Sequence, residues 1–108
     1  MKFIRKKVLA GERVFGTWCN LGSSVTAEAA GVSGLDWVLL DMEHGFGDHG
    51  NLGHQLQAVS ATPAVPIVRV GWNDPVQIKR VLDLGASGIM IPYVQSAQEA
   101  VAAARAMR

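Results

Sequence analysis

Acidic residues and a histidine follow directly on one apolar segment of the sequence. The segment at residues 36–41 reads DWVLLD, and Asp41, Glu43 and His44 stand at its end. The unperturbed pKa of histidine lies near neutrality, so His44 is a candidate general base. Two carboxylates beside an imidazole could hold a divalent cation, its water molecules or the imidazole itself. The alternatives are a solvated loop, or an Asp41 that caps the next element.

A second candidate is Arg69, which interrupts the apolar segment PIVRV at residues 66–70. A guanidinium keeps its proton in proteins, and burying it without a partner is costly. Arg69 therefore requires an anion, which is either a carboxylate of the protein or a carboxylate or enolate of a substrate. A purely structural ion pair is the alternative to a binding role.

Weaker signals come from residues outside these two segments. Asp83 lies near the C-terminal end of a predicted helix, where the helix dipole disfavours a carboxylate. This position suggests that Asp83 has a partner. A solvated helix face is the simpler explanation. Trp18 can wall a pocket or fill a core, and the core is favoured. Cys19 has no neighbouring group that would activate it as a nucleophile. The other histidines, His49 and His54, do not complete a metal-binding pattern such as H-E-x-x-H.

The elements that must position these residues alternate between helix and strand. The second strand is continuously apolar, as expected of a strand covered on both faces. Four strand–helix units of roughly 20–30 residues imply a parallel sheet with right-handed crossovers. Predicted helices cover residues 2–12, 23–34, 49–62, 73–88 and 96–108, and predicted strands cover residues 14–19, 36–41, 66–70 and 88–94.

The clearest helix signals lie in residues 73–88. Asp74 is suited to the N-cap, Pro75 to the first turn and Gln77 to the capping-box position, and Gly85 ends the helix. The first helix is predicted to be amphipathic through Phe3, Ile4, Val8 and Leu9 and to end at Gly11.

Two architectures fit this order of elements. One is a small doubly wound sheet, and the other is part of a (β/α)8 barrel, which normally takes about 250 residues. In both architectures function collects at the carboxyl ends of the strands. The chemically unusual residues lie there: Trp18 and Cys19, Asp41 to His44, Arg69 to Asp74, and Tyr93 and Gln95.

The bulk composition narrows the classes of function. The chain has 108 residues, of which 49% are hydrophobic, and a formal net charge of +1. Charges of both signs are scattered along the sequence. It therefore has no cluster of basic residues that would bind nucleic acid and no basic amphipathic helix that would bind a membrane surface. No apolar run is long enough to span a bilayer, and the single cysteine favours a reducing compartment. We therefore expect one cytoplasmic domain without nucleic-acid or membrane partners.

Two long segments resemble the HpcH/HpaI family of class II pyruvate aldolases. They are GTWCNLGSSVTAEAAGVSGLDWVLLDMEHG and VPIVRVGWNDPVQIKRVLDLGASGIMIPYVQSAQEA, and the motifs D-x-E-H and V-R-x-x-W-N-D at this separation make the resemblance specific. It implies a (β/α)8 TIM barrel, of which residues 1–108 form the N-terminal half with about four strand–helix units. It also implies a lyase that cleaves 4-hydroxy-2-oxo acids, including compounds of aromatic catabolism, into pyruvate and an aldehyde. Members of the family assemble as homo-oligomers, typically hexamers.

The resemblance also implies a role for each candidate residue. The base histidine must take the proton of the C4 hydroxyl, and the arginine must stabilise the enolate that forms as the bond breaks. An aspartate on an outer helix would reach the histidine across a subunit interface, because the helices run back from the active-site face. The implied catalytic residues are His44, Arg69 and Asp83, the implied substrate-binding residues are Arg69 and Trp18, and Asp41 and Glu43 match acidic residues beside the metal and its waters.

A divalent cation is the implied cofactor, either Mg²⁺, Mn²⁺ or Co²⁺. In the family one Glu and one Asp of later strands ligate it, so we expect no direct metal ligand in this chain. The sequence therefore represents a fragment of a longer aldolase, a truncated product without activity, or a half barrel that associates with a second half. The alternative function is an inactive α/β module that pairs with itself or with a partner chain, since open sheet edges invite pairing.

Overall fold

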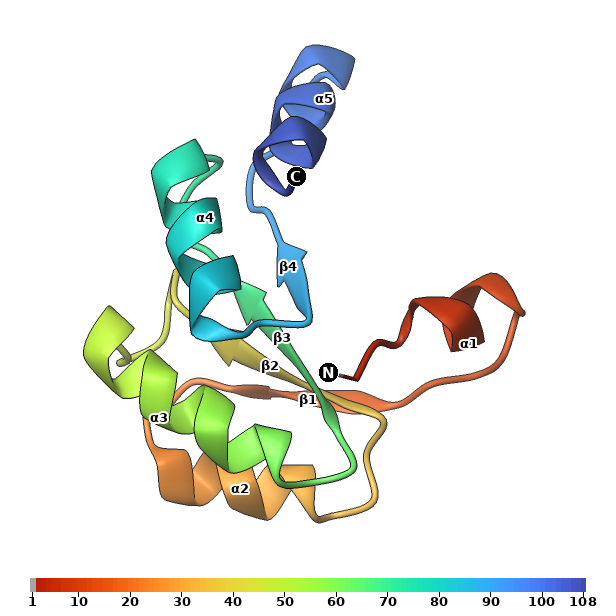
Figure 1. The fold of residues 1–108 in the computed structure, drawn as a ribbon, viewed down its shortest axis with the longest axis vertical. Helices are drawn as coiled ribbons and strands as arrows, with labels where there is room; N and C mark the ends of the chain where they lie inside the picture. The colour runs from red at the N-terminus through yellow and green to blue at the C-terminus, as the bar shows by residue number, and fades with distance from the viewer. Residues whose placement is uncertain (1) are drawn as a thin grey trace.

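The computed structural model describes residues 2–108, and these form a four-stranded parallel sheet with helices between the strands (Figure 1). Within this range no helix is both long enough and apolar enough to cross a membrane. In chain order the elements are α1 (Arg5–Leu9), β1 (Gly16–Cys19), α2 (Ser24–Gly31), β2 (Trp37–Asp41), α3 (His49–Ser60), β3 (Val65–Arg69), α4 (Pro75–Leu84), β4 (Gly88–Met90) and α5 (Ala97–Ala106).

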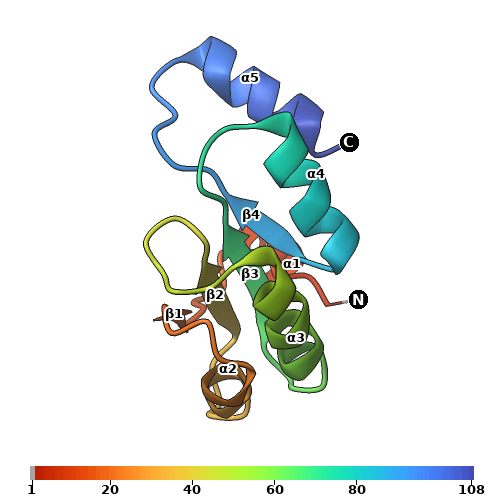
Figure 2. The ribbon, with the colours of Figure 1, turned by 90° about the vertical axis from the view of Figure 1, so that its left-hand side faces the viewer.

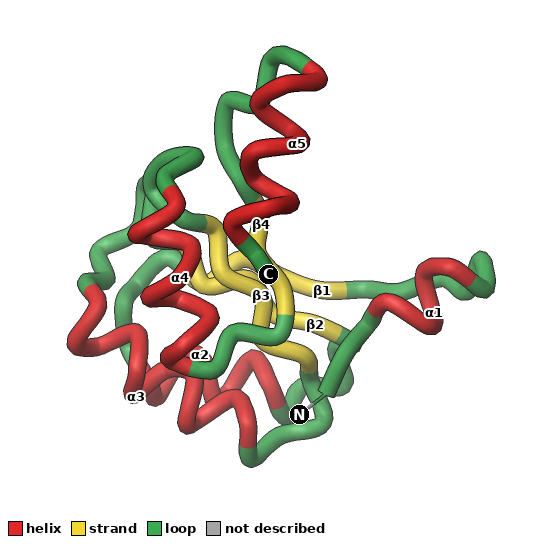
Figure 3. The backbone as a smooth tube through the Cα atoms, turned by 45° about the horizontal axis from the view of Figure 1, so that its top comes forward, coloured by secondary structure: helices red, strands yellow, loops and turns green. Residues whose placement is uncertain are grey.

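The strand order decides between the two predicted architectures. The strands lie in the order β1-β2-β3-β4, so each strand pairs with the next one along the chain. A doubly wound sheet reverses its strand order at a switch point and carries helices on both faces. Here α2, α3 and α4 gather on one side of the strands (Figure 3). The arrangement is that of a partial (β/α)8 barrel, with its helices on the outer face.

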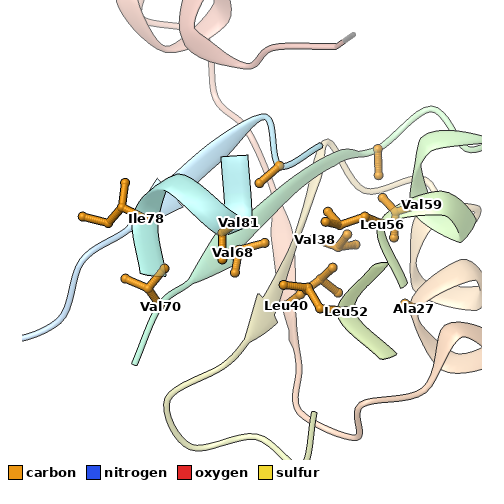
Figure 4. Close-up of a cluster of buried hydrophobic side chains, with 12 residues drawn as sticks. Ala27, Val38, Leu40, Leu52, Leu56, Val59, Val68, Val70, Ile78 and Val81 are labelled. Carbon is orange, nitrogen blue, oxygen red and sulfur yellow. The ribbon is translucent and has the colours of Figure 1, made fainter. Parts of the chain in front are cut away.

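The register of the sheet separates an outer face from an inner face. Side chains alternate along each strand, and Leu40 of β2 lies beside Val68 of β3. These two residues point toward the helices and form the core together with Leu52, Leu56 and Ile78 of α3 and α4 (Figure 4). Burying each of these aliphatic side chains contributes about 1.5–3 kcal/mol. The core therefore fixes the outer face of the sheet against the helices.

The inner face carries the residues that were predicted to do chemistry. Asp41 and Arg69 are register partners at the ends of β2 and β3, one position beyond Leu40 and Val68. Alternation places them on the opposite face from the core. Trp18 of β1 stands beside Leu39 of β2, on the same inner face.

The first helix differs from its prediction. It spans five residues rather than eleven and contains no buried residue. Phe3, Val8 and Leu9 are more than half exposed, because nothing within the described chain covers the apolar side of this helix. Figure 1 shows α1 projecting away from the sheet. Lys7 of this helix forms an ion pair with Asp36, with 3.4 Å between Nζ and Oδ1.

The predicted N-cap and the predicted end of α4 are confirmed, whereas the predicted capping-box role of Gln77 is wrong. Asp74 caps the helix by accepting a hydrogen bond from the Val76 amide, and Gly85 ends it with φ +112°. Gln77 does not complete a capping box, because its Oε1 accepts a hydrogen bond from the Gly71 amide at 3.2 Å. Gln77 therefore fixes the turn between β3 and α4.

The fourth strand is shorter than predicted. It ends at Met90 instead of extending to residue 94. Pro92 has no amide hydrogen to donate to a ladder, and Tyr93 has a φ of +56°, which lies outside the extended region. The other predicted elements are confirmed, with ends that differ by a few residues.

Candidate active site

A buried ion pair joins the carboxyl ends of the two central strands. Arg69 Nε lies 3.0 Å from Asp41 Oδ1, and Arg69 Nη2 lies 2.7 Å from Asp41 Oδ2. The Asp41 side chain is 1% exposed and the Arg69 side chain is 19% exposed. This two-point contact fixes the plane of the guanidinium, because both of its bonds must be satisfied together. The anion that was predicted to pair with Arg69 is thus, at least in part, the Asp41 carboxylate of the protein itself.

Asp41 also shapes the loop that carries the other acidic residues. Its Oδ1 accepts hydrogen bonds from the backbone amides of Glu43 at 3.0 Å and His44 at 3.2 Å. Burial would raise the pKa of Asp41, but the bonds from Arg69 and these amides outweigh it and hold the pKa below its usual range. The same pairing raises the pKa of Arg69. Asp41 is therefore an ionised carboxylate that positions both Arg69 and the following loop.

Glu43 connects the arginine to the histidine. Its Oε1 lies 3.0 Å from Arg69 Nη1 and 3.5 Å from His44 Nε2. The Glu43 side chain is 9% exposed, whereas that of His44 is 67% exposed. The imidazole thus stands at the mouth of the site with the carboxylate and the guanidinium behind it. The structure thus brings His44 and Arg69 together through Glu43, at the carboxyl ends of the strands where the unusual residues were expected to collect.

Trp18 forms one side of the same site. The guanidinium carbon of Arg69 lies 4.6 Å from the centre of a Trp18 ring, within the range of a cation–π contact. Trp18 is 44% exposed, so the prediction that it fills the core is wrong. It lies at the edge of the site because its strand position faces inward, where no helix covers the sheet.

The family model for HpcH/HpaI aldolase/citrate lyase matches residues 14–108. The chain belongs to this family. The resemblance drawn from the two motifs is therefore confirmed.

Relatives within the HpcH/HpaI family are named as aldolases. The chain is 50% identical over 93 residues to the 2-dehydro-3,6-dideoxy-6-sulfogluconate aldolase of Pseudomonas putida, covering 86% of this chain and 36% of that one. It is 46% identical over 99 residues to the 4-hydroxy-2-oxo-heptane-1,7-dioate aldolase of Escherichia coli, covering 92% and 38%. The chain thus spans less than half the length of these relatives.

A solved structure of the HpcH/HpaI family shares the fold. An HpcH/HpaI aldolase/citrate lyase family protein from Burkholderia cenocepacia superposes with a TM-score of 0.91 at 35% identity, over 97% of this chain and 42% of that one. The predicted fold class, α/β with part of a barrel, is confirmed.

Asp83 is not brought to the site by the fold of this chain. It is exposed on α4, which packs on the outer face of the sheet, whereas His44 belongs to the inner face. It lines a hollow of about 430 Å³ between α3 and α4. The other residues that line this hollow are His49, Gly50, Arg80 and Leu84. The catalytic role of Asp83 stays a prediction that requires a second subunit.

The two carboxylates of the site differ in what they can still bind. Both oxygens of Asp41 are engaged by Arg69 and by backbone amides. The contacts of Glu43 with Arg69 and His44 are made by Oε1. Among residues 2–108 no three His, Cys, Asp or Glu side chains form a group that could hold a metal ion. Glu43 is thus the better fit to the predicted contact with a metal-bound water.

Two aromatic residues near the site were placed among the unusual residues at the strand ends but were given no role by sequence reasoning. Trp72 and Tyr93 follow β3 and β4, and their rings lie against each other. Both stand in the segments where the unusual residues collect, which is the signal that could have indicated them. The positive φ of Tyr93 has no sequence signal, because tyrosine rarely adopts it. Cys19 is partly buried, which raises the pKa of its thiol and disfavours a nucleophilic role.

Replacing Asp41 by asparagine is expected to lower the free energy of unfolding at pH 7 by about 3 kcal/mol, because it leaves the Arg69 guanidinium without its two-point partner. Folding lowers the pKa of Asp41, so the wild-type contribution is complete above pH ~4 and is lost as the pH falls through the lower folded value. Urea denaturation at pH 7 and at pH 3 checks both statements, with a flatter acid dependence expected for the variant. The exposed Glu28→Gln is the control and should differ from wild type by less than about 0.5 kcal/mol.

Proposed function

We propose that the protein containing this chain is a metal-dependent aldolase that cleaves 4-hydroxy-2-oxo acids into pyruvate and an aldehyde. The observation that carries the proposal is the cluster of Arg69, Glu43 and His44 at the carboxyl ends of β2 and β3. The substrates named for the two relatives share a 2-oxo acid group and a hydroxyl at C4 and differ at their far ends. We infer that the Arg69, Glu43 and His44 cluster recognises the 2-oxo acid group and the C4 hydroxyl, which these substrates have in common.

Arg69 supplies the positive charge for the pyruvate end of the substrate. A guanidinium has five N–H groups, and Asp41 and Glu43 lie against three of them. One N–H on each terminal nitrogen is left for an oxygen of the substrate. The charge is already oriented by Asp41 and by the Trp18 ring, so no reorganisation is needed when negative charge develops on the enolate.

His44 is the group placed to move the proton of the C4 hydroxyl. Its imidazole is exposed at the mouth of the site, where a bound substrate can reach it. The Oε1 of Glu43, 3.5 Å from Nε2, stabilises the imidazolium that forms when the imidazole takes this proton. The reverse transfer returns the proton to the aldehyde oxygen during condensation.

The proposed cofactor is a divalent cation such as Mg²⁺, Mn²⁺ or Co²⁺. When bound, it would polarise the keto group and act as a sink for the electrons of the broken bond. The Glu43 carboxylate is the group of this chain that would hold one of its waters, and the direct ligands of the cation are proposed to come from outside residues 1–108. We further propose a cytoplasmic homo-oligomer, hexameric as in the family, in which Asp83 of one subunit approaches His44 of another.

The test is the exchange of pyruvate methyl protons in deuterated water, followed by mass spectrometry of the recovered pyruvate. The protein is purified as its gene encodes it and assayed with Mg²⁺, Mn²⁺ or Co²⁺. Exchange is expected with at least one metal and should stop when EDTA removes it, because enolisation requires the electron sink. If no metal supports exchange, the aldolase proposal is wrong for this protein. The result would then favour the alternative, a catalytically inactive α/β module.

A further inference from the structure

Two aromatic rings stand side by side in solvent at the carboxyl ends of β3 and β4. The ring centroids of Trp72 and Tyr93 are 5.5 Å apart, with an interplanar angle of 35°. Trp72 is 56% exposed and Tyr93 is 61% exposed. A paired apolar surface of this kind, left open at the functional end of a sheet, is a candidate binding surface. The loops that carry the two rings leave the same end of the sheet (Figure 2).

The backbone holds Tyr93 in an unfavourable conformation. Its φ of +56° is uncommon for a residue other than glycine, and within residues 2–108 it is the one such case. Strain of this kind persists where the surroundings enforce it, and it concentrates at functional sites. The loop is anchored by Glu99, whose Oε2 accepts a hydrogen bond from the Gln95 amide at 2.9 Å. The strained residue is therefore a fixed feature of the surface.

A hollow of about 300 Å³ lies beside the two rings. Its polar lining consists of the side chains of Asn73, Gln95 and Glu99, and no lysine, arginine or histidine lines it. Asn73 Nδ2 donates to the backbone oxygen of Glu99 at 3.1 Å, which ties the start of α4 to the start of α5. The hollow thus combines aromatic faces with amides and one carboxylate.

The hollow lies beyond the ends of β3 and β4, and Arg69 is the last residue of β3. Trp72 follows Arg69 by three residues, directly after the end of β3. Arg69 of β3 pairs with Met90 of β4, and Tyr93 follows Met90 by three residues, just as Trp72 follows Arg69. A substrate whose 2-oxo acid end contacts Arg69 would place its far end toward these rings.

We propose that the Trp72–Tyr93 hollow binds the aldehyde portion of the substrate and favours a neutral, hydroxylated chain over an anionic one. The inference rests on the proposed aldolase function. Ring faces pack against C–H groups, and the amides and carboxylate can pair with hydroxyl groups. A second carboxylate or sulfonate would meet Glu99 in this hollow without a cation to offset it. The selectivity would therefore differ from that implied by the names of the two relatives, whose substrates carry a second anionic group.

The experiment compares two rates in the protein as its gene encodes it, supplied with the metal that supports exchange. One is pyruvate methyl proton exchange, and the other is aldol condensation of pyruvate with D-glyceraldehyde or with 4-oxobutanoate. The wild type should have the higher kcat/KM with D-glyceraldehyde. Trp72→Ala and Tyr93→Gly should each lower the ratio of glyceraldehyde condensation to exchange about tenfold. Glycine at position 93 accepts the positive φ, so this variant removes the ring without a conformational penalty.

The matched control is Phe15→Ala, because Phe15 is also 61% exposed but precedes β1 at the opposite end of the sheet. It should leave both rates unchanged. A wild type that fails to exchange would overturn the proposed function and this inference with it. Normal exchange with an unaltered ratio in both ring variants would overturn the inference alone. An equal fall in both rates, with a lower thermal midpoint, would assign the rings a structural role and would also overturn it.

Discussion

Arg69→Ala should slow the exchange of pyruvate methyl protons by about 10²–10³-fold, the cost of removing one preorganised group that stabilises an oxyanion. The guanidinium is held by Asp41, by Glu43 and by the ring of Trp18, and it retains N–H groups for a substrate. Alanine removes both the positive charge and the N–H groups that would bind the substrate. The measurement is the exchange rate at saturating metal and pyruvate.

The same change should lower stability, and the two effects must be separated. Without Arg69 the buried Asp41 carboxylate loses its partner, which costs about 3–5 kcal/mol. Arg69→Lys keeps the positive charge but loses the two-point contact, so it should fold better and still exchange slowly. Arg80→Ala on the outer face of α4 is the control and should exchange at the wild-type rate. Exchange that persists in a folded Arg69→Ala variant would remove this residue from the mechanism.

His44→Gln is expected to slow cleavage of a 4-hydroxy-2-oxo acid by about 10²–10⁴-fold, the usual contribution of a general acid–base group. The glutamine side chain can still form a hydrogen bond, but it cannot take the C4 hydroxyl proton. The His44 side chain is 67% exposed, so the free energy of unfolding should change by less than about 0.5 kcal/mol. Loss of activity in this variant would therefore report chemistry rather than folding.

Pyruvate release from the 4-hydroxy-2-oxo acid measures this effect, with thermal unfolding as the check on folding. His54→Gln is the matched control, because His54 is exposed on α3 and makes no contact with the cluster. It should cleave at the wild-type rate. Equal rates for the two histidine variants would mean that another group, or water alone, moves the proton.

The placement of the cluster explains why these residues can act together. Asp41 and Arg69 are the last residues of adjacent strands and are fixed by the ladder and by the core beneath it. Sites built on strand ends are held more tightly than sites on free loops. His44, in contrast, lies on a loop whose shape depends on two amide bonds to Asp41. A change at Asp41 should therefore reach both Arg69 and His44.

Local signals in the sequence determined the elements and the identity of the candidate residues. Apolar runs ending in polar residues located β2 and β3, and Asp74 with Gly85 located the ends of α4. The position of Arg69 in an apolar strand predicted an anionic partner, and Asp41 is that partner. These predictions succeeded because helix ends are set by neighbouring residues, and because a charge within an apolar strand requires a partner wherever the fold supplies it.

Only the tertiary structure decided how those residues are arranged. It placed Arg69 between Asp41 and Glu43, exposed Trp18 at the edge of the site and left the apolar side of α1 uncovered. The physical reason is that pairing, stacking and burial depend on strand order and register, and these arise from contacts between segments far apart in the chain.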